Sequence, residues 1–323
     1  MKKLIALAVA SSVSAVAMAD LSITGSLKTN YTHKDYEHAT SNDSDSFSTE
    51  GDLKITGKSG DTTVVMNFGN IDAASGNGSS PVAEDVYLTT KIGDINVKMG
   101  DYDNGNNPYR ASTRAQRASL STSLGGFDIA YTNGNGTANG GSDYQDDEVS
   151  IGTTLGGVKA KYVAKDSADA FSVSTEVAGV NVSYTSDNPD AAQTDRTVLE
   201  VSTEVQGVGI KYGQIDADLS ATISGDSWMG DYEASAVEFT PLAGQDVTAV
   251  ELSTNVAGNK VAFRNINVDG YATAGYDWSM NKVIVTRPLA SGATLEITYK
   301  DIQDDGSVYT DVEILDIELA VSF

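Results

Sequence analysis

Residues 153–162 read TTLGGVKAKY, a Gly-Gly turn followed by apolar residues at every second position and closed by an aromatic residue. In an extended strand Val158 and Tyr162 lie on one face. Lys159 and Lys161 lie on the opposite face. The segment therefore predicts a β-hairpin whose second strand separates an apolar environment from water.

The same pattern recurs in four other segments. Each copy opens on Thr, turns on a residue followed by Gly, and ends on Tyr or Phe. The spacing between copies varies, which excludes a solenoid of fixed period and favours hairpins joined by loops of variable length. The copies are TSLGGFDIAY at 122–131, TEVAGVNVSY at 175–184, TEVQGVGIKY at 203–212, and TNVAGNKVAF at 254–263, where the residue after the turn is polar.

Short connections alternate with longer polar ones along the chain. Transmembrane barrels have this asymmetry, with short turns on the periplasmic side and long loops outside, whereas a soluble sandwich does not sort its loops by length. We therefore predict an all-β fold, a transmembrane antiparallel up-and-down β-barrel of 18 strands by turn count. Sixteen strands is the alternative for two reasons. The connection near Ser167 is very short, and segment 217–245 could form either a further strand or a loop. The short connections are 59–61, 93–94, 125–126, 156–157, 178–179, 206–207, 257–259 and 291–292.

Aromatic residues share one position in the pattern, near the loop-side end of a strand that leaves a short turn. Such a row is typical of the outer interfacial girdle of a membrane barrel. The alternative, ordinary enrichment of aromatic residues in strands, explains their number but not their common position. The row comprises Tyr31, Phe68, Tyr131, Tyr162, Tyr184, Tyr212, Phe263 and Tyr299.

The N-terminal segment has the features of a secretory signal peptide. Lys2 and Lys3 precede a short apolar run, and residues 17–19 read AMA. The run is too short to span a bilayer, which requires roughly 20 apolar residues. We predict a signal peptide at 1–19 and one barrel domain at 20–323. With a formal net charge of −24 and no cysteine, the chain has no disulfides and is unsuited to nucleic acid.

The chain ends on LDIELAVSF at 315–323, an alternating strand closed by Phe323. This end resembles the signal by which outer-membrane barrels reach the barrel-insertion machinery. Together with residues 20–31, 51–68 and 86–101, it resembles the general diffusion porins of Gram-negative bacteria. The resemblance implies an outer-membrane location, homotrimers of barrels with about 16 strands, contact with membrane lipid and lipopolysaccharide, and passive diffusion of small hydrophilic solutes and ions.

A porin selects solutes by the width and charge of its pore, so the predicted functional residues are those that face the lumen. A Lys or Arg facing lipid at mid-bilayer costs roughly 2–4 kcal/mol, which assigns these side chains to the interior. The predicted lumen-lining residues are Lys28, Lys54, Lys91, Lys98, Lys159, Lys161, Lys211, Arg264, Lys300, Glu200, Glu251 and Glu296. Further inward acids are Asp128, Asp316 and Glu318.

The third long connection, 102–114, follows the strand that precedes the constriction loop in the porins that the chain resembles. We predict that it narrows the pore, although it lacks that loop's Pro-Glu-Phe-Gly-Gly motif. The alternative is a set of solvated charges on an external loop. The constriction candidates are Asp101, Asp103, Arg110, Arg114 and Arg117.

Bond chemistry has little support in the sequence. The two histidines, His33 and His38, are more simply explained as solvated loop residues than as metal ligands, and no nucleophile with a positioned base is evident. We therefore expect no enzyme activity, metal or cofactor. The alternatives to a diffusion porin are a substrate-selective channel and a surface adhesin or structural barrel with acidic loops.

Overall fold

A computed structural model describes residues 20–36, 43–69, 82–103, 114–134, 147–165, 168–189, 195–218, 228–229, 246–269, 277–304 and 311–323. The predicted signal peptide lies outside the described residues. The strands are β1 (Asp20–Tyr36), β2 (Ser44–Ser59), β3 (Thr62–Gly69), β4 (Val82–Ile92), β5 (Ile95–Asp103), β6 (Arg114–Leu124), β7 (Phe127–Gly134), β8 (Glu148–Leu155), β9 (Val158–Lys165), β10 (Ala168–Val177), β11 (Val180–Pro189), β12 (Arg196–Val205), β13 (Val208–Ala217), β14 (Asp246–Val256), β15 (Asn259–Asp269), β16 (Trp278–Pro288), β17 (Ala293–Asp304) and β18 (Val312–Ser322).

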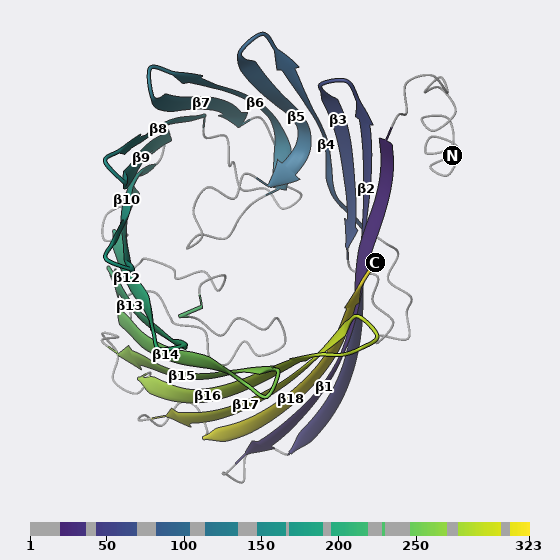
Figure 1. The fold of residues 1–323 in the computed structure, drawn as a ribbon, viewed down its shortest axis with the longest axis vertical. Helices are drawn as coiled ribbons and strands as arrows, with labels where there is room; N and C mark the ends of the chain where they lie inside the picture. The colour runs from purple at the N-terminus through teal and green to yellow at the C-terminus, as the bar shows by residue number, and fades with distance from the viewer. Residues whose placement is uncertain are drawn as a thin grey trace.

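The strands close into one antiparallel ring (Figure 1). Each strand pairs with its neighbours in the chain, and β1 pairs with both β2 and β18, so the ring has no free edge between its first and last strands. The prediction of an up-and-down barrel with 18 strands is confirmed. Among the described residues, no helix is long and apolar enough to cross a membrane.

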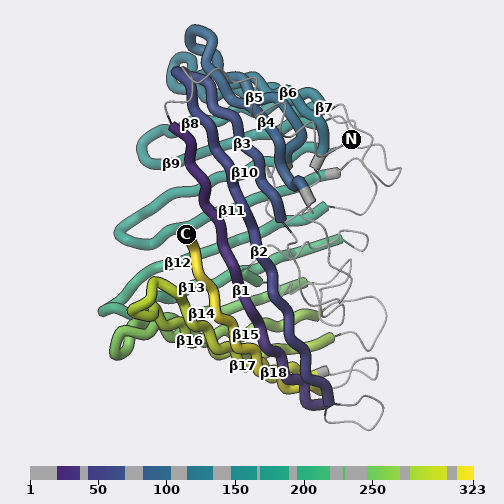
Figure 2. The backbone as a smooth tube through the Cα atoms, turned by 90° about the vertical axis from the view of Figure 1, so that its right-hand side faces the viewer, coloured from purple at the N-terminus to yellow at the C-terminus, as the bar shows by residue number. Residues whose placement is uncertain are grey.

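The strands are tilted, and the short turns gather at one end of the barrel, on the left of Figure 2. We call this the turn end and the opposite end the loop end. The first residue of each short turn in the repeats has a left-handed backbone. This residue is Gly in two of the repeats, but in another it is Gln206, with φ 53°. The following residue, Gly207, has φ 79°. Two successive residues with positive φ form the hairpin turn that matches strand twist, which explains the repeated Gly.

Relieving this backbone strain should stabilise the barrel. We expect Gln206→Gly to raise the free energy of unfolding by about 1 kcal/mol, because a left-handed non-glycine residue costs roughly that much. The matched control is Gly207→Ala, which should destabilise through the backbone alone, since a Cβ there meets no atom within 4 Å. Urea unfolding in detergent measures both, and equal stability of the two variants would contradict the assignment.

The Thr that opens each repeat ties its hairpin to the preceding one. The hydroxyl of Thr153 donates to the carbonyl of Gly126 in the previous turn at 2.9 Å. Thr203 donates in the same way to Gly179 at 3.0 Å. The recurrence of Thr in the sequence therefore has a structural cause that spacing alone did not reveal. The other ties are Thr122 to Asp94, Thr175 to Gly157, and Thr254 to Gly207.

The outer face of the barrel carries the apolar residues of the alternating pattern. Large side chains such as Ile151, Leu155 and Phe263 are more than 40% exposed on it. An exposed apolar band around a closed barrel is what a lipid bilayer covers.

The alternation inverts its phase beyond the aromatic row. On β15, Phe263 is outward and 43% exposed, whereas Ile266 and Val268 are inward and at most 1% exposed. Asn265 and Asn267 take the outward positions, where they hydrogen-bond to each other. Polar residues outside and apolar residues inside are the pattern of a barrel in water, which indicates that the strands leave the bilayer at the aromatic row.

We call the loop-end parts of β12 to β18 the collar. Their inward side chains form a single buried apolar cluster, joined by Met229 from the connection between β13 and β14. The cluster comprises Val198, Ile215, Met229, Val247, Ala249, Ile266, Val268, Trp278, Met280, Ile302, Val312 and Ile314.

The candidate pore and its lining

Charged side chains on the inner face pair across neighbouring strands. Arg264 on β15 meets Glu251 on β14 at 2.6 Å, and Lys211 on β13 lies 3.4 Å from Glu200 on β12. The register places the members of these pairs on the face opposite to Phe263. Charges kept inside the ring in this way are separated from the apolar outer band, and paired charges lower the net charge of the wall.

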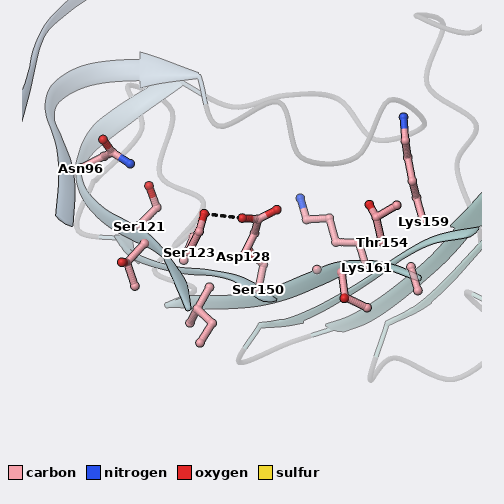
Figure 3. Close-up of a pocket in the computed structure, with 14 residues that line it drawn as sticks. Asn96, Ser121, Ser123, Asp128, Ser150, Thr154, Lys159 and Lys161 are labelled. Atoms are coloured by element: carbon pink, nitrogen blue, oxygen red, sulfur yellow. Dashed lines mark hydrogen bonds between the residues drawn. The ribbon is translucent and has the colours of Figure 1, made fainter. Parts of the chain in front are cut away.

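The inner wall of β5 to β9 is open and rich in hydroxyl groups toward the turn end. Its side chains line a hollow of about 500 Å³. Figure 3 shows these side chains, with Ser123 donating to Asp128. Lys159 and Lys161 extend over the same hollow. A second hollow continues along β9 to β13, between Lys159, Glu200 and Lys211. Small polar side chains leave room for water here, and the two lysines provide most of the local positive charge.

Toward the loop end the inner wall is buried. Arg196 on β12 hydrogen-bonds Asp187 on β11 at 2.7 Å, and both side chains are at most 5% exposed. Lys300 on β17 pairs with Asp316 on β18 at 3.3 Å with similarly little exposure. The inner wall thus carries exposed polar side chains toward the turn end and buried ion pairs toward the loop end.

The remaining predicted lumen residues lie on the inner face by register. Lys98 is held between two tyrosine rings, with its Nζ 4.1 Å from the centre of Tyr87 and 3.8 Å from that of Tyr102. Lys28 pairs with Glu50 at 3.0 Å in an exposed position. In the register Lys54 faces Asn67, Lys91 faces Asn96, and Glu296 faces Thr286, whose hydroxyl donates to it at 2.9 Å.

The described constriction candidates lie near the loop-side ends of β5 and β6, and the two whose side chains are described, Asp101 and Arg117, lie on opposite faces of the sheet. Arg117 pairs with Gly100 and shares the inner face with Lys98. Asp101 pairs with Val86, whose exposed side chain lies on the outer face, so the register directs Asp101 away from the lumen. The backbones of Asp103 and Arg114 pair in the register where β5 ends and β6 begins. Arg110 lies outside the described residues.

Sequence reasoning missed one lumen element, the pair Trp228 and Met229. Trp228 Nε1 donates to Glu200, and Lys211 Nζ lies 4.1 Å from the centre of the indole ring. Met229 is fully buried against Gly213. The two residues lie in sequence segment 217–245, which lacks the turn-and-alternation pattern of the repeats, so no signal in the sequence assigns them to the lumen.

The histidine region gives no metal site. His33 Nδ1 lies 2.8 Å from Asp45, which also accepts a hydrogen bond from Tyr31. Across the described ranges, no group of three or more His, Cys, Asp or Glu side chains is placed to hold a metal ion. His38 lies outside those ranges.

Comparison with solved structures identifies the architecture. OccK1 (OpdK) of Pseudomonas aeruginosa superposes with a TM-score of 0.67 at 12% identity, over 95% of this chain and 99% of that one. OccAB4 of Acinetobacter baumannii superposes with a TM-score of 0.65 at 12% identity, over 95% and 98%. The chain shares the fold of these proteins. OpdK is an outer-membrane protein. Sequence comparison alone matches no family model and no curated protein.

Proposed function

We propose that the protein is an outer-membrane porin of Gram-negative type, through which small hydrophilic solutes and ions diffuse. The observation that carries the proposal is the division of the closed barrel into an apolar outer band and a charged, hydroxyl-rich interior. The similarity to the Occ barrels supports it at the level of the fold. A barrel with this division places a polar passage across a membrane, and bond chemistry is not required.

Planar bilayer recording tests the proposal. Purified, folded protein should produce stepwise increases in current, and a salt gradient across the bilayer should give a reversal potential of defined sign. A folded barrel that gives no steps would contradict the porin and favour the adhesin or structural barrel.

Lys159 should contribute to ion selectivity because it extends over both open hollows. We expect Lys159→Glu to shift the reversal potential toward cation selectivity, because the change places negative charge in the water-filled part of the wall. The control is Arg287→Glu, the same reversal of charge on an exposed residue of the outer face near the turn end. Equal shifts in both variants would show that total charge, and not charge in the lumen, sets selectivity.

A substrate-selective channel is the second candidate. The buried ion pair between Arg196 and Asp187 and the apolar cluster of the collar favour it, because covered wall residues leave fewer sites open to solutes at the loop end than at the turn end. Current block by millimolar concentrations of particular solutes would distinguish selective binding from unselective diffusion.

We also propose that the barrels form homotrimers and that Phe323 directs insertion into the outer membrane. A further proposal is that lipopolysaccharide contacts the polar outer surface beyond the aromatic row. The outward asparagines beyond Phe263 support this contact, since lipid headgroups and not acyl chains would meet them. Cross-linking of intact membranes followed by unboiled electrophoresis measures the oligomeric state.

A further inference from the structure

We infer that Trp228 and Met229, which lie between β13 and β14 in the chain, form an internal latch that binds the inner wall and narrows the pore at this point. The inference rests on the proposed porin function and names residues that narrow the pore. Figure 1 shows this short coloured segment inside the ring of strands. Its contacts within the described residues include the inward-facing Glu200, Lys211 and Gly213, so the chain at this point occupies space on the lumen side of the wall.

Three charged side chains lie around the indole of Trp228. Its Nε1 donates to Glu200, its ring face lies 4.1 Å from Lys211 Nζ, and Arg264 Cζ lies 5.6 Å from the ring centre. Glu251 in turn pairs with Arg264 at 2.6 Å. The indole therefore completes a network of two cations and two carboxylates whose formal charges cancel, and cation–π contacts strengthen as water is excluded from them.

Met229 provides an apolar anchor beside this polar one. It is fully buried and belongs to the apolar cluster of the collar, which also includes Ile215 and Val247. The space that Met229 occupies against β13 is available because residue 213 is Gly. A Cβ at that position would collide with Met229 Sδ and would stand 2.7 Å from Trp228 Cζ2. Gly213 is an inward residue of β13 in extended backbone, so its lack of a side chain serves the approach of the latch and not a turn.

The geometry allows the latch to be displaced without changing its own residues. In Gly213→Ala the new methyl group takes the space of Met229, and the latch must move from the wall toward the pore axis. We expect single-channel conductance to fall, because pore diameter governs ion flow. Trp228→Ala combined with Met229→Ala should instead raise it roughly twofold, because two large side chains leave the lumen. The matched control is Gly152→Ala, an inward glycine of the open wall where the nearest atom to a Cβ is 3.6 Å away; its conductance should equal that of the wild type.

Fluorescence gives a second measurement that does not depend on current. The chain has two tryptophans, so Trp278→Phe leaves Trp228 as the single reporter. In that background, iodide should quench Trp228 weakly, and adding Gly213→Ala should increase quenching and shift emission to longer wavelength. Unboiled electrophoresis identifies variants that remain folded.

The outcomes separate the two proposals. A wild-type protein without channels would overturn the porin function itself. Channels in the wild type with unchanged conductance in folded Gly213→Ala would overturn the latch and leave the porin standing. Unchanged quenching after Gly213→Ala would also overturn the latch, because it would show that Trp228 does not depend on the space beside Gly213.

Discussion

The variant Asp187→Ala is expected to lose roughly 3–5 kcal/mol of unfolding free energy, the cost of leaving a buried charge without its partner. Arg196 donates to Asp187 at 2.7 Å, and the two side chains are 3% and 5% exposed. Truncating Asp187 leaves the guanidinium in a site that little water reaches. Urea unfolding in detergent, followed by circular dichroism, measures the loss.

Two controls separate the effect of burying the Asp187–Arg196 pair from the effect of leaving one charge unpaired. Replacing both members with apolar residues, as Asp187→Leu with Arg196→Met, should be much less harmful than Asp187→Ala, because no unpaired charge remains. Glu50→Ala breaks the exposed pair with Lys28, whose side chain is 48% exposed, and should cost below about 1 kcal/mol. Equal, small losses for Asp187→Ala and Glu50→Ala would mean that water reaches the loop end as freely as the turn end.

The barrel could be predicted because its information is local and repeated. In a segment such as 153–162 the turn, the alternation and the closing aromatic residue all favour the same hairpin. The structure confirms this reading for the strand count and for closure. The role of Thr153 was not predictable in the same way, since its acceptor, the carbonyl of Gly126, belongs to the preceding hairpin.

The collar was missed because the apolar phase was taken as constant along each strand. The signal was present in the sequence of β15, where Phe263 is followed by Asn265 and Asn267 in the outward phase and by Ile266 and Val268 in the inward phase. Searching each strand for this inversion would have located both the membrane boundary and the buried wall. No such search would have placed Trp228, because its position depends on contacts with residues on two different strands.

Deleting Phe323 is expected to reduce assembly in the outer membrane severely while leaving the purified chain able to refold in detergent. In the barrel, Phe323 N–H donates to the Gly25 carbonyl at 3.0 Å and its carbonyl accepts from Gly25 N–H at 2.9 Å. Two backbone hydrogen bonds contribute only about 1–3 kcal/mol, and the ring is 67% exposed, so little stability is lost. A large effect in cells would therefore arise from recognition before insertion. Membrane fractionation and in vitro refolding measure the two quantities separately.

Gly25→Ala provides the opposite perturbation at the same seam. A Cβ on Gly25 would stand 2.6 Å from Phe323 Cζ and 2.8 Å from the Asp52 carbonyl oxygen, so the ring must leave its seat while the chain still ends on Phe. If the terminal aromatic residue is a signal, this variant reaches the outer membrane in near-normal amount but unfolds at lower urea concentration. Deletion of Phe323 shows the reverse. Loss of assembly in both variants would instead assign Phe323 to closure of the barrel. In that case the pairing of β1 with β18 limits assembly, and the identity of the last residue does not.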